Sequence, residues 1–322
     1  MPLLSICIPT YNRSNLLEEC IKSIFASSNK YLNDIEIIVS DNASTDDTEV
    51  RVAKLQRIYQ QIKYHKNKTN VIDKNFFISA GLASGDYIWV FGDDDKMELI
   101  AIGQVLEKIR AGYNLIVVNH SIWLEHFSVK FKDKVVPFKN DMIFNDHNKL
   151  LSILGPRLGF ISSVIIKKEK FSKISSSEYN PFLKYGFAFL FSIYAAVNQD
   201  CYAYFIAEPL VRQTGSLKAS DISIWYKIFA KGSSLVFEEL HQKGYSRQAV
   251  RSAKYLVLRD YVMHDISFRK RKGEGLNGIF GLILPFYKNL LFFWVVIVPA
   301  LFAPRILVLL TNRMAKKVCG KN

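Results

Sequence analysis

Three consecutive carboxylates, Asp93, Asp94 and Asp95, follow the apolar stretch 86–91. Like charges about 4 Å apart repel by roughly 4 kcal/mol at an effective dielectric constant of about 20, and a bound divalent cation turns that repulsion into attraction. An extended stretch would point Asp93 and Asp95 the same way, whereas a tight turn would present Asp94. Mg²⁺ and Mn²⁺ take one or two carboxylates together with phosphate oxygens. We therefore predict a metal site for a phosphorylated ligand; the alternative is a solvated loop in which one aspartate caps the next helix.

The first apolar stretch, residues 3–9, ends in a loop that can hold a nucleotide, and this loop contains Pro9, Thr10, Tyr11 and Arg13. Tyr11 offers a flat face to a base and Thr10 offers a hydroxyl. Arg13 carries a planar fork that suits phosphate or base edges. An aromatic residue and an arginine are also common in strand-to-helix loops. This loop therefore indicates a nucleotide site only in combination with the other polar loops.

Two further polar loops follow apolar stretches in the same way. Asp41 ends the stretch 35–40, where its carboxylate can accept a base N–H, and Asn42 comes next. Asx-turn and helix-cap chemistry over 42–46 is the alternative. Lys74 and Asn75 open an expected helix, where Lys74 either reaches phosphate or stays a surface lysine.

The elements expected around these loops alternate between strand and helix. We predict strands at 3–9, 35–40, 62–65, 86–91, 115–118, 161–167 and 201–206, and helices from a cap at Ser14 and over 47–61, 72–83, 97–110 and 182–197. Such alternation implies right-handed crossovers and a mostly parallel α/β sheet. Ligands bind beyond the carboxyl ends of the strands in such a sheet, and all the polar loops above lie at that edge.

The residues at this edge resemble glycosyltransferase family 2, and more narrowly the abequosyltransferase-like enzymes of bacterial O-antigen synthesis. The matching segments are 5–13, 39–46, 73–76 and 83–95, with a weaker echo at 162–169. The resemblance implies a GT-A fold with a Rossmann-like sheet, and transfer of a sugar from a nucleoside diphosphate sugar to a saccharide or lipid-linked acceptor.

The resemblance also implies roles for the site residues. The first loop and Asp41 would hold the base, and the aspartates would hold the ribose and a Mg²⁺ or Mn²⁺ ion on the diphosphate. Asp94 matches the principal metal ligand, supported by Asp93 and Asp95. The usual family pattern is Asp-x-Asp-Asp, and Gly92 replaces its first aspartate.

An inverting transferase needs a carboxylate that takes the proton of the acceptor hydroxyl. Many family members carry an acidic pair well downstream of the metal motif. The corresponding part of this chain has no such pair, so Glu178 is the candidate base and Asp200 a second one.

The formal net charge of +14 suits nucleic acid, an anionic membrane or phosphorylated small molecules. The four cysteines lie far apart and no basic n-region opens the chain, so we expect a reduced, cytoplasmic protein. Residues 273–278 spell G-x-G-x-x-G, but this motif follows a basic run rather than an early strand, which is not the setting of a dinucleotide-binding loop.

The last third of the chain is helical and basic, then apolar. The longest uncharged stretch, 289–304, is shorter than the ~20 residues of a bilayer span, and basic residues flank it at 269–272 and 313–321. We predict a peripheral segment on the inner-leaflet membrane surface; a buried helix pair is the alternative. The expected organisation is a catalytic domain over 1–215, with a donor half (1–120) and an acceptor half (121–215), and a helical membrane-associating region over 216–322.

Two other functions compete with transfer. A metal-dependent protein that binds nucleic acid or transfers nucleotides fits the charge and the Gly-Asp-Asp string, but the helix expected after that string argues against a polymerase hairpin. A membrane scaffold without catalysis would not need all three aspartates. We therefore expect no nucleic-acid partner. The residues do not distinguish the sugar, the base or the oligomeric state.

Overall fold

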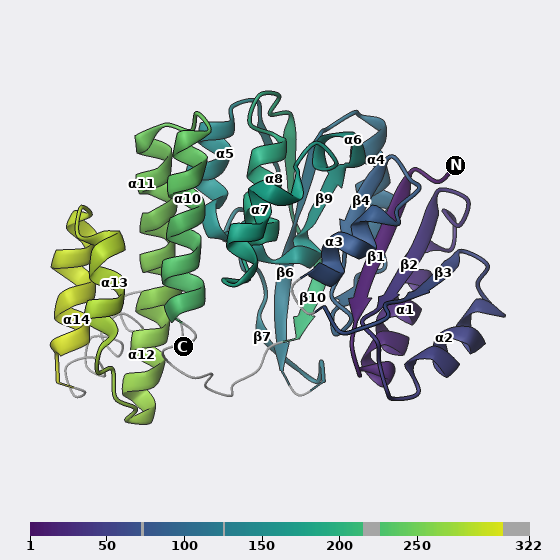
Figure 1. Cartoon of the computed structure of the whole chain (residues 1–322), viewed down its shortest axis with the longest axis horizontal. Helices are drawn as coiled ribbons and strands as arrows, with labels where there is room; N and C mark the ends of the chain where they lie inside the picture. Colours follow the sequence, from purple (N-terminus) through teal and green to yellow (C-terminus); the bar gives the residue numbers. More distant parts are fainter. Residues whose placement is uncertain (72–73, 125, 215–225, 305–322) are drawn as a thin grey trace. The chain divides into compact units, whose positions relative to one another are not determined.

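The structure is a computed structural model that describes residues 1–71, 74–124, 126–214 and 226–304 (Figure 1). Asp73 and the basic residues at 313–321 lie outside the described residues. The chain divides into two compact units. Unit 1 comprises Met1–Leu150, Arg157–Lys184 and Ala188–Lys218, and unit 2 comprises Leu151–Pro156, Tyr185–Phe187 and Ala219–Asn322.

Unit 1 contains the strands and most of the shorter helices. The strands are β1 (Leu4–Thr10), β2 (Ile35–Asp41), β3 (Ile62–Lys66), β4 (Tyr87–Val90), β5 (Lys96–Met97), β6 (Leu115–Leu124), β7 (Val129–Lys132), β8 (Met142–Phe144), β9 (Val164–Lys167) and β10 (Ala203–Thr214). The helices are α1 (Ser14–Ser28), α2 (Thr48–Gln56), α3 (Asn75–Gly81), α4 (Ala101–Arg110), α6 (Lys168–Phe171), α7 (Ser176–Leu183) and α8 (Ala188–Ala196), with the 3₁₀ turn η3 (Ile161–Ser163); α5 (His147–Leu154) and the 3₁₀ turn η2 (Gly155–Gly159) have residues in both units.

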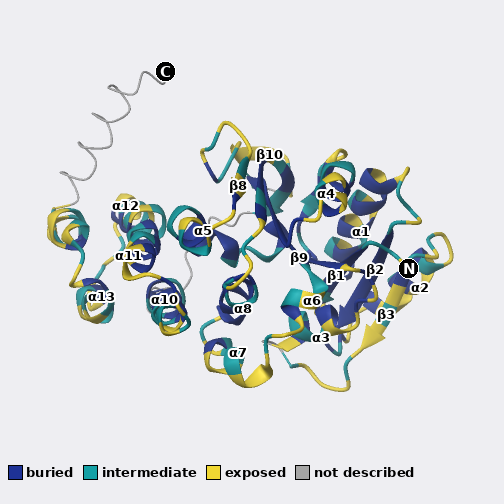
Figure 2. Cartoon of the chain, turned by 90° about the horizontal axis from the view of Figure 1, so that it is seen from above, coloured by how far each residue is buried: buried dark blue, intermediate teal, exposed yellow. Residues whose placement is uncertain are grey.

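The described strands form one mixed sheet in the order β3-β2-β1-β4-β9-β6-β10-β5, with β7 and β8 paired to β6 and β10. The pairs β3/β2, β2/β1, β1/β4 and β6/β10 are parallel, and β9 runs antiparallel between β4 and β6. Helices α1 and α4 cover one face of this sheet and α3 and α6 the other (Figure 2). The predicted α/β class with a mostly parallel sheet is confirmed.

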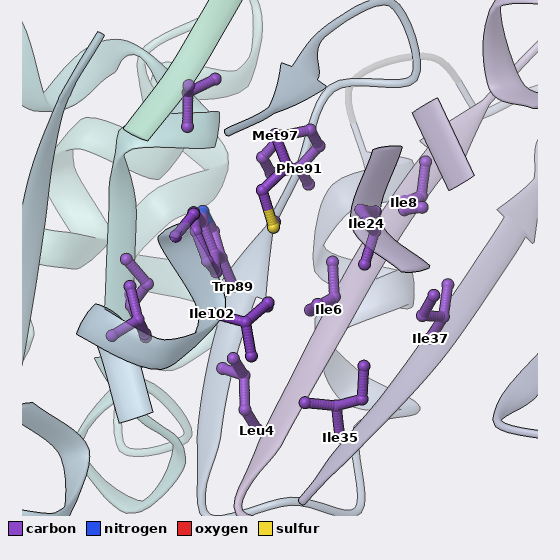
Figure 3. Packing of buried hydrophobic residues seen from close by; sticks show 14 of the residues in the cluster. Leu4, Ile6, Ile8, Ile24, Ile35, Ile37, Trp89, Phe91, Met97 and Ile102 are labelled. Carbon is purple, nitrogen blue, oxygen red and sulfur yellow. The ribbon is translucent and has the colours of Figure 1, made fainter. Parts of the chain in front are cut away.

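The core explains why the first strands read as apolar runs. Leu4, Ile6 and Ile8 alternate onto one face of β1 and are fully buried, and Ile24 of α1 packs over them (Figure 3). A strand buried on both faces is apolar along its length. The prediction that Ser14 caps α1 is wrong. The helix begins at Ser14 itself, whose N–H donates to Asp46 of a neighbouring loop at 3.1 Å.

Several predicted elements have different bounds in the structure, and for three of them strand pairing or the local backbone gives the cause. The helix after the aspartates begins only at Ala101, because Lys96 and Met97 pair with β10 as a short strand. The strand predicted at 201–206 continues to Thr214 because β6 pairs with it over that length. The helix predicted at 182–197 is two helices, α7 and α8, separated by a turn with φ +69° at Gly186.

Unit 2 is helical from residue 226 in its described part, as predicted. Its helices are α10 (Ser233–Gln242), α11 (Arg247–Leu256), α12 (Met263–Lys272), α13 (Ile279–Tyr287) and α14 (Val298–Phe302), with π-helical turns η4 (Lys227–Gly232), η5 (Val257–Val262) and η6 (Phe293–Ile297). Within the described ranges, every helix is too short or too polar to cross a bilayer.

Candidate functional site

The carboxyl ends of β1, β2 and β4 bring the first loop and the aspartates together. Thr10 lies opposite Asp41 in the parallel register of β1 and β2. The hydroxyl of Thr10 donates to Asp93 Oδ2 at 2.8 Å, although 83 residues separate the two in the chain. The predicted convergence of this loop with the aspartates is therefore confirmed by a direct contact.

The aspartates form a tight turn rather than an extended stretch. The N–H of Asp95 donates to the Gly92 carbonyl at 3.2 Å, which closes the turn. Among the three carboxylates, that of Asp94 is the most exposed, with a side-chain exposed fraction of 36% against 7% for Asp93. Of the two arrangements that the sequence allowed, the structure shows the one that presents Asp94.

Arg13 joins the first loop to this turn. Its Nη1 lies 3.0 Å from Asp93 Oδ1 and 3.1 Å from Asp94 Oδ2. Burial raises the pKa of Asp93, and the positive charge of Arg13 opposes that rise. In turn, the charge of Asp93 is the main cause that raises the pKa of Arg13. The guanidinium thus serves as the counter-charge of the turn.

Asp95, in contrast to the partly exposed Asp94, is buried. Its Oδ2 accepts from the Ser162 hydroxyl at 2.6 Å and its Oδ1 from the Thr214 N–H at 3.2 Å. Burial, reinforced by the charges of Asp94 and Asp93, raises its pKa to about 7, although both hydrogen bonds oppose the rise. Asp95 thus ties the turn to β10 and to the 162–163 segment. These two bonds leave acceptor positions free on its carboxylate, so a metal-binding role for all three aspartates stays a prediction.

No group of three or more His, Cys, Asp or Glu side chains suited to a metal ion occurs within the described ranges. The donors present nevertheless fit an ion that binds together with a diphosphate. Mg²⁺ and Mn²⁺ use one or two carboxylates and fill their other positions with phosphate oxygens and water. Asp94 supplies one outward carboxylate and Asp93 lies beside it, so the turn suits such a shared site.

Asp41 is buried at the end of β2 rather than open to solvent. Its Oδ2 accepts from the Tyr64 hydroxyl at 2.5 Å and its Oδ1 from the Ser44 N–H at 2.8 Å. A carboxylate offers about four acceptor positions, so these two bonds do not exhaust it. Tyr64 was missed in the sequence because a tyrosine in a strand carries no signal of such a contact.

Asn42 and Asn75, two residues of the predicted nucleotide site, belong to a network that holds the loops. Asn42 Oδ1 accepts from Asn67 Nδ2 at 3.1 Å and from the Val71 N–H at 2.9 Å. Asn75 is also buried, and its Nδ2 donates to the Ser40 carbonyl at 2.8 Å. Both amides are bonded within the protein and hold these loops in place. Their contact with a nucleotide stays a prediction.

The remaining residues of the predicted nucleotide site lie at the surface of this edge. Tyr11 and Lys74 are exposed, and Pro9 is partly buried in β1. Asn12, between Tyr11 and Arg13, adopts φ +52°, and its Oδ1 accepts from the Thr45 N–H at 2.8 Å. This asparagine therefore fixes the loop that carries Tyr11 and Arg13, a role that the sequence analysis did not assign.

The candidate bases have structural partners. Glu178 is the third residue of α7, where its carboxylate accepts from the Ser175 N–H at 2.9 Å in a capping box. Asp200 is paired with Lys170 at 2.5 Å. The capping box explains why Glu178 stands at the start of a helix. The role of Glu178 as the catalytic base stays a prediction.

The sequence model of Glycosyl transferase family 2 matches residues 5–165. Abequosyltransferase RfbV of Salmonella typhimurium is 32% identical over 226 residues, which cover 65% of this chain and 66% of that protein. GalNAc(5)-diNAcBac-PP-undecaprenol beta-1,3-glucosyltransferase of Campylobacter jejuni is 41% identical over 115 residues, which cover 35% of this chain and 36% of that protein. The matched parts are thus just under two thirds of the first relative and much less of the second.

Among solved structures, TarS (residues 1–349) of S. aureus in complex with UDP-GlcNAc superimposes with a TM-score of 0.60. The superposition covers 81% of this chain and 72% of that one, at 15% sequence identity. At this identity the likeness shows a shared fold, and it confirms the predicted GT-A architecture.

Proposed function

This chain belongs to glycosyltransferase family 2, and on that premise we propose that it transfers a sugar from a nucleoside diphosphate sugar to a lipid-linked saccharide during the synthesis of a bacterial surface polysaccharide. The observation that carries the proposal is the contact of Thr10 and Arg13 with Asp93 and Asp94, which joins a loop suited to a nucleotide with an outward carboxylate. The family match leaves the nucleic-acid alternative without support.

The donor would lie across the carboxyl edge of the sheet. Tyr11 would stack on the base and Asp41 would accept a base N–H through a free acceptor position. Arg13 and Lys74 would contact the phosphates, since a guanidinium and an ammonium both bond phosphate oxygens strongly. Asp93 would contact the ribose in place of the aspartate that Gly92 replaces.

Asp94, with Asp93 beside it, would hold a Mg²⁺ or Mn²⁺ ion. Such an ion neutralises the negative charge that develops on the diphosphate as the sugar leaves. The contribution of the chain is to hold Asp94 outward. The turn at Gly92 does so, because Ser162 and Thr214 hold Asp95 inward.

The names of the relatives support the acceptor class. One acts on a glycan linked through a diphosphate to undecaprenol, and the other is an abequosyltransferase. We propose a lipid-linked saccharide as acceptor here too, together with a hexosyl or deoxyhexosyl donor. A lipid-linked acceptor lies at the membrane, so unit 2 would attach to the cytoplasmic face of the inner membrane.

The proposed transfer is tested by the binding of donors and by transfer itself. Nucleoside diphosphate sugars with uracil, thymine, cytosine or guanine are titrated into the full chain by calorimetry, with and without Mn²⁺. We expect the donors with one of these bases to bind, and to bind more tightly with Mn²⁺. When the sugar of such a donor is labelled, we expect the label to be transferred to lipid extracted from bacterial membranes. Binding of none of them, with or without the metal, would contradict the proposal.

Exposed apolar side chains of unit 2 support the membrane attachment. Leu291, Trp294 and Val295 are all exposed around η6. We expect their joint replacement by serine to move most of the full-length protein from the membrane fraction to the supernatant, because burial in lipid contributes roughly 25 cal/mol per Å² of apolar surface. The measurement is immunodetection after ultracentrifugation. Serine at Val50 and Ile58, exposed apolar residues of unit 1, is the control and leaves the distribution unchanged.

A further inference from the structure

The discounted G-x-G-x-x-G segment, residues 273–278, connects α12 to α13 and borders a cavity in unit 2. The cavity volume is about 270 Å³. Its lining combines charged, polar and apolar groups: Lys270, Glu274, Leu276, Asn277, Gly278, Phe280, Leu301 and Phe302. The sheet of unit 1 contributes nothing to this lining, so the cavity is separate from the aspartate turn.

Lys270 is a buried cation without an anionic partner in the described part of the chain. The exposed fraction of Lys270 is 9%, and its Nζ donates to the Ala303 carbonyl. The nearby acids are engaged elsewhere, since Arg269 bonds both Asp265 at 2.8 Å and Glu274 at 2.9 Å. Burial accordingly lowers the pKa of Lys270. A buried ammonium group is costly unless an anion neutralises it, and it carries three donors of which the carbonyl takes one.

A second source of positive potential borders the same cavity. Helix α13 starts after Gly278, which has φ +79° and no side-chain cap. The first α-helical (i to i−4) hydrogen bond of α13 is donated by the Leu282 N–H to the Gly278 carbonyl at 3.2 Å. The amides of Phe280 and Gly281 precede it and lie at the positive end of the helix, which favours phosphate groups.

The rim of the cavity is apolar and open. Phe302 has an exposed fraction of 69%, and its ring centroid lies 5.7 Å from that of Phe280. Trp294, also exposed, lies outside this lining, and its ring centroid is 6.4 Å from that of Phe280. An anion site bordered by exposed aromatic side chains suits a ligand with a charged head and an apolar tail rather than a free ion.

We propose that this cavity binds the phosphate head of a membrane lipid, with Lys270 Nζ and the first amides of α13 on the phosphate and Phe302 and Trp294 against the lipid chain. The inference rests on the membrane attachment proposed above and adds a defined lipid site to it. The proposal gives the last glycine of the motif a structural role. Gly278 adopts a left-handed conformation that lets the chain turn into α13 beside Lys270.

The test measures binding of the full chain to vesicles of phosphatidylcholine with and without phosphatidic acid, by co-sedimentation. We expect phosphatidic acid to strengthen binding, and Lys270→Met to weaken binding to these vesicles about tenfold because a charge-assisted bond to phosphate is lost. Lys288→Met is the matched control: it removes the same charge from an exposed site in unit 2 outside the cavity lining, and we expect a change of about twofold at most.

A second variant guards against a folding defect in Lys270→Met. Phe302→Ser changes an exposed side chain, and we expect this variant to bind the same vesicles more weakly. Inorganic phosphate should still compete with the vesicles for the variant, because Lys270 is unchanged. Equal losses in Lys270→Met and Lys288→Met would overturn the proposal, as would vesicle binding indifferent to phosphatidic acid. Binding of inorganic phosphate at Lys270 without any vesicle binding would identify a free-phosphate site and overturn it as well. Donor titration in the same variants reports on unit 1 alone, so failure here is distinguishable from failure of the proposed transfer.

Discussion

Replacement of Asp94 by asparagine is expected to lower the rate of sugar transfer about 1000-fold, the scale reported for loss of one group that stabilises developing charge. Asparagine keeps the size of the side chain but removes the negative charge that would hold a cation on the diphosphate. The fold should tolerate the change, because the Asp94 side chain is partly exposed and, among the described residues, bonds only Arg13. The measurement is the initial rate of labelled sugar transfer with Mn²⁺ present.

Two comparisons make this result specific. Asp133→Asn, at a side chain that is 84% exposed, should retain full transfer. Calorimetry should show that Asp94→Asn binds the nucleoside diphosphate with nearly the same affinity with and without Mn²⁺, whereas the wild type binds it more tightly with the metal. If the variant keeps the metal-dependent affinity of the wild type, Asp94 is not the metal ligand, and the proposed donor site is wrong.

Replacement of Glu36 by alanine is expected to lower the free energy of unfolding by about 3 kcal/mol, because it removes a buried carboxylate from a network of donors. The carboxylate accepts from the Ser84 N–H at 2.6 Å and from Gly85 N–H at 3.2 Å, and it pairs with Lys63 at 2.6 Å. The Ser5 hydroxyl donates to it as well. Without Glu36 the buried Ser5 hydroxyl and the Ser84 N–H lose this acceptor at the amino end of β2.

The effect of Glu36 should depend on pH in a defined direction. Burial raises its pKa, but hydrogen bonds from Lys63, Ser5 and Ser84 outweigh burial and lower the pKa to about 2. A carboxyl group whose pKa is lower in the folded state stabilises the fold above its unfolded pKa and loses that effect as the pH falls. The difference between wild type and variant should therefore be largest at neutral pH and shrink as the pH falls from about 4.5 toward 2.

Urea denaturation at several pH values measures this difference. Glu107→Ala, which removes an exposed glutamate that pairs with Lys108, is the control and should change the free energy of unfolding by less than about 1 kcal/mol. A Glu36 variant as stable as the wild type at neutral pH would show that the network contributes little. Donor binding per folded molecule should be unaffected, since Glu36 lies at the end of β2 opposite Asp41.

The sequence alone determined the sheet and the edge that carries the site. The apolar runs at β1, β2 and β4 predict buried parallel strands, and the polar residues that follow them predict ligands at the carboxyl edge. These inferences hold because strand period, crossover handedness and the position of loops are local or topological properties. They placed Thr10 and Asp93 at one site, which the structure confirms by a direct contact.

Only the tertiary structure decided which side chain at that edge faces outward. Asp95 turns inward because Ser162 and Thr214, 67 and 119 residues further along the chain, supply its donors. Asn42 and Asn75 are engaged by partners on β2 and in the 67–71 loop, and Glu178 is engaged at the start of α7. Neighbouring aspartates are alike in sequence, and their different roles arise from donors that meet them only once the chain has folded.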